Sequence, residues 1–289
     1  MLFLSAPIGS HLVPGKEGEQ ERNELVKKAA TMDVKAITIK SLPEWSEAQL
    51  SEARSFLDSN GLRVGEFSGF YKGKNSAGGL GAWENDDREY TKQLYRRQLR
   101  QGKALGAHLV GFSLYAGRKS GGLMWAEETW QRCVEDIRWL AREAENVGID
   151  VAGHPHILGP LCSIDRYKRL IDAVPSPRLK ILMDPVNLVE PFMAYRTGDL
   201  INKIFDELGD YITGLHAKDV ALSGGGNVVA HVDEAVPGRG SMDYHTIFRR
   251  LGKLKQDIAI HAEHFPYSET IEGQQYIRSV ARQVGVEVQ

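Results

Sequence analysis

The chain has 289 residues, of which 42% are hydrophobic and 26% are charged, and its formal net charge is −2. This balance of charge argues against a general binder of nucleic acids or of membrane surfaces. Cys133 and Cys162 form no Cys-Xaa-Xaa-Cys pair and no disulfide framework, so a reducing compartment, the cytoplasm, is the simplest expectation. The first residues lack the basic lead-in of a signal peptide, and the sequence contains no apolar run long enough to predict a membrane span.

Short apolar segments alternate with longer amphipathic segments along the chain. The short segments are rich in Val, Ile, Leu and Phe, which is typical of buried parallel strands. We expect eight strands, at residues 2–6, 36–39, 62–67, 107–114, 149–153, 179–183, 212–217 and 258–263.

The clearest helical pattern covers residues 126–147. Apolar residues recur there every three or four positions from Trp130 to Ala144, and charged residues occupy the other face. Gly148 is predicted to end this helix in a left-handed conformation.

Serine residues mark the expected starts of three other helices. Ser46 and Gln49 have the spacing of a capping box, so we expect a helix to begin there. Ser163 is expected to cap the fifth helix, and Ser241 the seventh.

Eight strand and helix units predict an α/β fold, a (β/α)₈ TIM barrel, with residues 1–289 forming a single domain. A doubly wound open sheet is the alternative, but no Gly-rich phosphate-binding fingerprint follows the first strand. Gly-rich or aromatic loops are expected to form the rim of a site, at residues 68–86, 115–126, 184–196 and 219–241. We interpret the glycine run 224–226 as a hinge or a mobile lid segment.

Four residues of metal-ligating type lie at the ends of the last four predicted strands. They are His154, Asp184, His216 and Glu263, at intervals of 30, 32 and 47 residues. A barrel unit takes about 31 residues, and the last interval is longer because residues 219–241 form an extended loop. These positions are therefore expected to be equivalent on successive strands and to converge at one mouth. Each residue alone also fits an ordinary cap or ion pair, but the joint pattern favours a site for one divalent ion.

The segments around these residues resemble motifs of the xylose-isomerase-like TIM barrel superfamily, which includes sugar phosphate isomerases and epimerases and the family 2 AP endonucleases. Residues 215–219, Leu-His-Ala-Lys-Asp, are similar to its strand-seven motif and are the most specific piece. Further similarities lie at residues 180–184, 262–265 and 235–243. The resemblance implies that the metal ligands are His154, Asp184, His216 and Glu263.

Two residues depart from the pattern of the ketose epimerases. His154 stands where those enzymes usually carry a glutamate that moves a proton, and Asn187 stands where they tend to carry a histidine. A metal-bound imidazole is a poor base, so Glu263 or the unligated His156 is expected to abstract the proton. Lys218 is expected to donate to a substrate oxygen.

Each of these roles has a structural alternative. His156 fits equally well as a group that orients a metal ligand. Lys218 could instead pair with Asp219 or Glu263, and we expect a packing or supporting role for His261.

Four further residues are candidates for substrate binding. They are Asn187, Arg239, Glu66 and Trp83, with His231 as a weaker candidate in the 219–241 loop. Arg239 could hold an anionic group, and Trp83 could stack on a sugar face. A surface arginine and a locally packed tryptophan are the ordinary alternatives.

The expected activity is that of a metal-dependent isomerase or epimerase that acts on a ketose or related hydroxy-ketone through an enediolate. A metal-dependent lyase or dehydratase on a keto-sugar or keto-inositol is the alternative, and a metal nuclease or a non-catalytic sugar-binding subunit are further ones. The expected cofactor is one divalent ion, Mn²⁺ first and Zn²⁺, Co²⁺, Fe²⁺ or Mg²⁺ otherwise. The expected partner is a small sugar or polyol rather than nucleic acid or a membrane, and a homo-oligomer is suggested only by analogy with other barrels.

Overall fold

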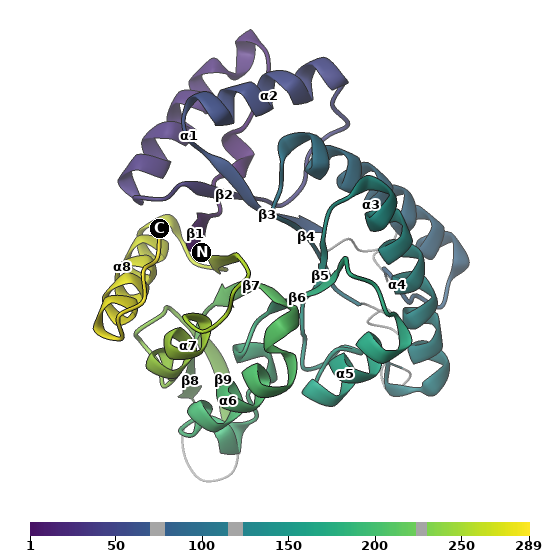
Figure 1. Ribbon diagram of the computed structural model, residues 1–289, viewed down its shortest axis with the longest axis vertical. Coiled ribbons are helices and arrows are strands. Elements are labelled where there is room, and N and C mark those ends of the chain that lie inside the picture. The colour runs from purple at the N-terminus through teal and green to yellow at the C-terminus, as the bar shows by residue number, and fades with distance from the viewer. Residues whose placement is uncertain (70–78, 115–123, 224–229) are drawn as a thin grey trace.

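The computed structural model describes residues 1–69, 79–114, 124–223 and 230–289. Parallel strands close into an eight-stranded barrel in the order β1, β10, β7, β6, β5, β4, β3, β2, and the helices surround it (Figure 1). The predicted (β/α)₈ TIM barrel is therefore confirmed. Among the described residues, no helix combines the length and the apolar character that crossing a bilayer requires.

The barrel strands agree closely with the predicted segments. They are β1 (Leu2–Ala6), β2 (Ala36–Ile39), β3 (Arg63–Gly69), β4 (Leu109–Phe112), β5 (Val151–Gly153), β6 (Leu179–Met183), β7 (Ile212–Ala217) and β10 (Ile258–Ala262). The largest difference is at β4, where the predicted strand, 107–114, started two residues too early and ended two residues too late. Ala107 lies in the connection after α3, where its N–H closes the helix end by donating to the carbonyl of Gly102 at 2.8 Å.

One α-helix follows each barrel strand along the chain. The α-helices are α1 (Glu19–Thr31), α2 (Glu47–Ser59), α3 (Asn85–Leu105), α4 (Glu127–Val147), α5 (Ile164–Ala173), α6 (Thr197–Leu208), α7 (Tyr244–Leu251) and α8 (Tyr267–Gln283). Short 3₁₀ turns lie in the connections: η1 (Gly9–His11), η2 (Lys16–Gly18), η4 (Val186–Leu188), η5 (Pro191–Met193) and η6 (Gly209–Tyr211).

Three of the predicted helix ends are confirmed. Ser46 and Gln49 form the capping box at the start of α2. The side chain of Ser163 accepts from the first turn of α5. Gly148 ends α4 with a φ of 75°, which a residue with a side chain rarely adopts.

The predicted cap of α7 is wrong. Asp243, not Ser241, caps this helix, because its carboxylate accepts from the N–H of Thr246 at 2.9 Å. The Ser241 hydroxyl lies two residues upstream and donates to the carbonyls of Ala194 and Val220 instead.

The segment 219–241 contains an antiparallel hairpin rather than only a loop. Strands β8 (Asp219–Ser223) and β9 (His231–Ala235) pair along their whole length after β7. Much of β9 is exposed, so it lacks the apolar pattern that identifies a buried strand. The predicted hinge at 224–226, and the parts of the rim loops at 70–78 and 115–123, lie outside the described residues.

The barrel interior changes from apolar to polar along its axis. Alternate strand residues point at the axis, and the lower layers are formed by Phe3, Ala36, Ala259, Leu109, Ala152 and Leu182. Nearer the carboxyl ends of the strands, the buried residues are Ser5, Thr38, Glu66, His216 and His261. The mouth of the barrel is therefore lined with buried polar side chains.

Candidate metal centre

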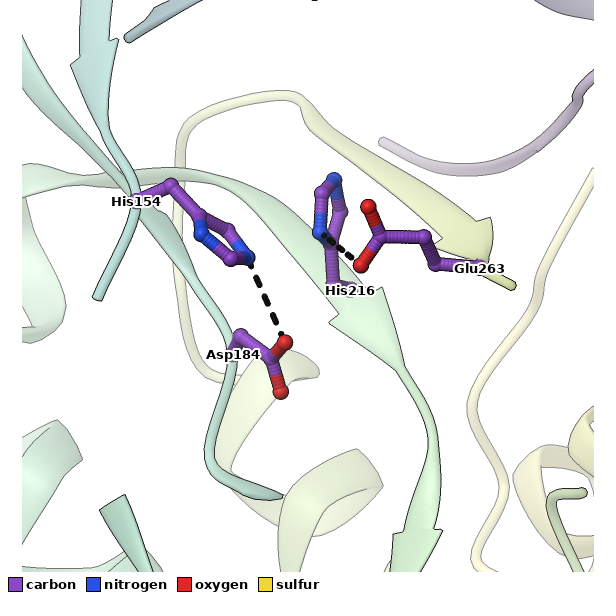
Figure 2. A group of neighbouring side chains, drawn as sticks. All are labelled: His154, Asp184, His216 and Glu263. Carbon is purple, nitrogen blue, oxygen red and sulfur yellow. Dashed lines mark hydrogen bonds and ion pairs between the residues drawn. The ribbon is translucent and has the colours of Figure 1, made fainter. Parts of the chain in front are cut away.

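Four buried side chains converge at the carboxyl ends of four adjacent strands. His154 follows β5, Asp184 follows β6, His216 lies in β7 and Glu263 follows β10. One potential ligand atom from each residue lies within 4.8 Å of the others, and Figure 2 shows the side chains turned toward a common point. The inward alternation of the strands produces this convergence, because each residue has the parity of the axis-facing layers below it.

The four side chains form two contacting pairs. Nε2 of His154 lies 3.3 Å from Oδ2 of Asp184, and Nδ1 of His216 lies 2.9 Å from Oε2 of Glu263 (Figure 2). The two imidazole rings are 4.7 Å apart between centroids. Each pair therefore places a nitrogen beside a carboxylate oxygen.

Glu66 orients His216 from below. Its Oε2 lies 3.0 Å from Nε2 of His216, and its Oε1 accepts from the hydroxyl of Ser68. Burial favours the neutral acid, but the charge and hydrogen bond of His216 overcome it and lower the pKa of Glu66 to about 2. Burial also opposes charge on His216, yet Glu263 and Glu66 raise its pKa to about 10. A carboxylate on one ring nitrogen leaves Nδ1, the other nitrogen, facing the cluster.

Lys218, the residue between β7 and β8, reaches the cluster. Its Nζ lies 2.7 Å from Oδ2 of Asp184, 2.7 Å from Oε1 of Glu234 and 3.3 Å from Oε2 of Glu263. Burial opposes the charge, but Asp184 and Glu263 together raise the pKa of Lys218.

Asp219, the alternative partner of Lys218, instead fastens the hairpin. Its carboxylate accepts the N–H groups of Val220, Gly238 and Met242.

The donor set fits a divalent ion. Two imidazoles and two carboxylates suit Mn²⁺, Fe²⁺, Co²⁺ or Zn²⁺. Oδ1 of Asp184 is buried and accepts no hydrogen bond from the residues that the structure describes. A buried carboxylate oxygen in this state is costly unless a cation meets it.

Two predicted residues lie near the cluster without joining it. His156 is exposed and its Nδ1 accepts the N–H of Leu158 at 3.1 Å. Burial of part of the ring, followed by the charges of His154 and Lys218, lowers the pKa of His156. Asn187, in η4, donates to the carbonyl of Pro155 at 3.1 Å and ties the loop after β6 to the loop after β5.

Two other predicted substrate-binding residues have local partners. Arg239 lies in exposed ion pairs with Glu269 and Glu272 of α8. The indole of Trp83 donates to the hydroxyl of Thr129 at 3.1 Å, and the guanidinium of Arg132 lies 4.8 Å from its ring centroid. The structure does not bring Arg239 into the cluster, and the substrate contacts of both residues stay predictions.

His261 and His231 also lie apart from the four. His261 is buried beneath His216, with ring centroids 5.3 Å apart, and its Nδ1 lies 3.2 Å from the hydroxyl of Thr38. This agrees with the expected supporting role. His231 is exposed at the start of β9.

Glu234 and His264 were missed by the sequence analysis. Oε2 of Glu234 lies 2.9 Å from Nδ1 of His264, whose Nε2 lies 3.3 Å from Oε1 of Glu263. The hydrogen bonds to Glu234 and Glu263 raise the pKa of His264 to about 9. Only the position of His264, next to Glu263, could have been noticed. Glu234 gave no signal because the hairpin that carries it was not predicted.

The family is shown by comparison with known proteins. Residues 26–281 match the family described as xylose isomerase-like TIM barrel, and the chain belongs to that family.

Two curated relatives and one solved structure are similar to the chain. Fructoselysine 3-epimerase of Escherichia coli O157:H7 is 29% identical over 146 residues, 48% of the chain and 47% of that protein, so the match spans about half of its length. D-psicose 3-epimerase of Ruminiclostridium cellulolyticum is 23% identical over 266 residues, 86% of the chain and 80% of that protein. A xylose isomerase-like TIM barrel protein of Mycobacterium smegmatis, in complex with magnesium, has a TM-score of 0.72 at 14% identity, covering 98% of the chain and 97% of that structure. At this identity, the structural likeness shows the fold.

Proposed function

We propose that the protein is a divalent-metal-dependent epimerase or isomerase of a ketose or related hydroxy-ketone. The observation that carries the proposal is the convergence of His154, Asp184, His216 and Glu263 at the barrel mouth. We assign these four residues to one divalent ion, with Mn²⁺ as the first candidate. The two curated relatives, both sugar 3-epimerases by name, support a ketose as the substrate class.

The chemistry divides between the ion and the side chains. When bound, the ion supplies a positive charge that polarises a carbonyl and acidifies the neighbouring C–H. Glu263 takes the proton from that carbon, and the electron pair of the broken C–H bond forms the enediolate. Lys218 donates to a substrate oxygen as negative charge develops there. Return of a proton to the opposite face of the same carbon gives an epimer, and return to the former carbonyl carbon gives an isomer.

A cavity opens at the rim of the barrel beside the ends of β1 and β2 and the start of α8, and none of the four cluster residues lines it. Its volume is about 400 Å³, within the range of small-molecule sites. It is lined by Pro7 and Ile8 after β1, Lys40 after β2 and Phe265 after β10. Thr38, which contacts His261, also lines it, so the cavity adjoins the buried polar layer at the mouth.

Metal analysis of purified variants tests the proposal. Wild type is expected to hold about one divalent ion per chain, and His154→Ala and Glu263→Ala are expected to lose it. Glu135→Ala, an exposed carboxylate on α4, is the matched control and should keep the ion. Equal metal content in all four proteins would remove His154 and Glu263 from the ligand set.

A product assay tests the reaction. Incubation with D-psicose or D-fructose should give the other sugar or a further ketose of the same mass, separated by chromatography. One observation favours a lyase as the second candidate: β5 supplies His154 instead of a carboxylate, and elimination needs only one base. A product with a new conjugated chromophore would select the lyase.

A further inference from the structure

The rim cavity, bounded by the ends of β1 and β2 and the start of α8, carries positive charge and hydroxyl groups but no acid. Lys28 of α1 and Lys40 after β2 contribute two ammonium groups to its lining, and Ser10 and Ser41 contribute hydroxyls. None of the described residues that line it is Asp or Glu. The chain as a whole has 38 acidic and 36 basic residues, so this lining is one-sided. The cavity therefore suits an anion better than a cation.

The cations of the rim cavity differ in whether an acid already compensates them. Nδ1 of His11 lies 2.5 Å from Oε2 of Glu21, and Nζ of Lys28 lies 4.0 Å from Oε1 of Glu24. Lys40 is exposed, and no carboxylate of the part of the chain that the structure describes pairs with it. Lys40 is therefore the lining cation whose charge is left for a ligand to meet.

Lys40 stands at the same level of the barrel mouth as Glu263. Oγ1 of Thr38 in β2 lies 3.2 Å from Nδ1 of His261 in β10, so these two residues share a layer. Lys40 comes two residues after Thr38, and Glu263 comes two residues after His261. Residues two apart along a strand project to the same side. Only β1 separates β2 from β10, so the backbones of Lys40 and Glu263 are about 10 Å apart.

The lining between these two positions is apolar. Pro7 and Ile8 follow β1, the strand between β2 and β10, and Phe265 lies two residues beyond Glu263. Such a surface can contact the carbon chain of a sugar without requiring a hydrogen bond from it. A ketose whose reacting carbon lies at Glu263 can therefore extend along this surface and place its far end at Lys40.

We propose that the rim cavity holds an anionic group, a phosphate or a carboxylate, at the end of the ketose distant from its carbonyl, and that Lys40 selects for it. An ammonium group binds such an anion through charge-assisted hydrogen bonds. A neutral hydroxyl at the same place leaves the ammonium without a counter-charge. The inference rests on the proposed function and adds the class of substrate, which is an anionic ketose.

The test compares Lys40→Met and Lys40→Arg with Lys35→Met. Methionine keeps most of the length of the side chain without its charge, and arginine keeps the charge. Lys35 is an exposed lysine directly before β2, at the other end of the strand, and does not line the rim cavity.

Four ligands are compared with each protein in the presence of the divalent ion. They are D-fructose, its 6-phosphate, the analogue with a carboxylate at carbon 6, and inorganic phosphate. Calorimetry measures the binding of each ligand, and kcat and KM are measured for the three sugars. The decisive quantity is the preference, the ratio of the affinity for an anionic sugar to the affinity for D-fructose.

Wild type is expected to bind one of the anionic sugars about 10–100-fold more tightly than D-fructose, as one charged hydrogen-bonding contact allows. Added salt should reduce the preference, because the cavity is open to solvent. Lys40→Met should bring the preference close to one, mainly through KM, whereas Lys40→Arg and Lys35→Met should retain it. A loss of structure would weaken all three sugars alike and leave the ratio unchanged.

Three results would overturn the inference. Wild type could bind the neutral and anionic sugars equally, Lys40→Met could keep the wild-type preference, or inorganic phosphate could bind through Lys40 while neither anionic sugar binds better than D-fructose. The last result would make the cavity a site for a separate anion. In each case, conversion of D-fructose would leave the proposed function standing. A preference that depends on Lys40 without conversion of any ketose would support the anion site and refute the proposed function.

Discussion

Glu66 and His216 lie 150 positions apart in the chain, yet Oε2 of the first meets Nε2 of the second at 3.0 Å inside the barrel. The contact crosses the barrel from β3 to β7. It fixes which ring nitrogen of His216 faces Asp184 and Glu263, since the other nitrogen is already engaged.

Replacing Glu66 should weaken the proposed metal site without removing a proposed ligand. Glu66→Gln is expected to reduce metal affinity by about 10–100-fold, because His216 loses the carboxylate that orients its ring. Competition with a chromophoric chelator measures the affinity. Glu143→Gln, a partly buried carboxylate on α4 that pairs with Arg96, is the control. An unchanged affinity in Glu66→Gln would show that His216 is held by its packing alone.

Metal binding should release a proton. The pKa of His216 is about 10 in the metal-free protein, so the ring is charged at neutral pH and must become neutral to bind an ion. The apparent affinity is therefore expected to rise with pH, by about tenfold per unit for one proton, up to that pKa. Calorimetry at pH 6, 7 and 8 in buffers of different ionisation enthalpy counts the protons. An affinity independent of pH in this range would contradict the prediction.

Asp136 is expected to be a strong determinant of stability. It is buried on α4, where its carboxylate accepts from Arg88 of α3 at 2.7 and 2.9 Å and from the N–H of Gly81 at 2.7 Å. Asp136→Ala leaves these donors without their acceptor and should cost about 3 kcal/mol in the free energy of unfolding. Glu135→Ala removes only an exposed contact to Arg88 and should cost less than about 1 kcal/mol. Urea unfolding of both variants makes the comparison, and equal losses would refute it.

A side chain at position 240 should displace the hairpin. A Cβ on Gly240 would lie 2.4 Å from Oδ1 of Asp219 and 2.4 Å from the carbonyl oxygen of Val220, so these groups must move. Gly240→Ala is expected to destabilise the protein by about 1–3 kcal/mol and to reduce ketose turnover. In Gly209→Ala, the new Cβ meets Leu254 at 3.5 Å and Phe205 at 4.0 Å, both ordinary contacts, and stability should hardly change. Thermal melting together with the turnover assay checks both variants.

The barrel and the convergence of His154, Asp184, His216 and Glu263 could be anticipated because both depend on periodic features. Parallel strands recur at regular intervals, and residues of equal parity at their ends meet at one mouth. The contacts of Glu234 could not be anticipated in this way. They depend on the pairing register of an exposed hairpin whose outer strand carries little apolar pattern.

The ion-pair partners of Arg239 also could not be predicted from the sequence. Its position between two glycines suggested a free cation, but Glu269 and Glu272 present a carboxylate pair on α8, three residues apart on one helix face. Which surface groups meet is decided by how α8 packs beside the loop. Neither sequence segment contains that information alone.

The mouth of the barrel is built from two parts, the barrel strands and the β8–β9 hairpin. The four converging residues lie at the carboxyl ends of barrel strands, whereas Glu234 belongs to the β8–β9 hairpin, which Asp219 fastens. A change in the length or register of the β8–β9 hairpin would move Glu234. The four converging residues at the strand ends would stay in place.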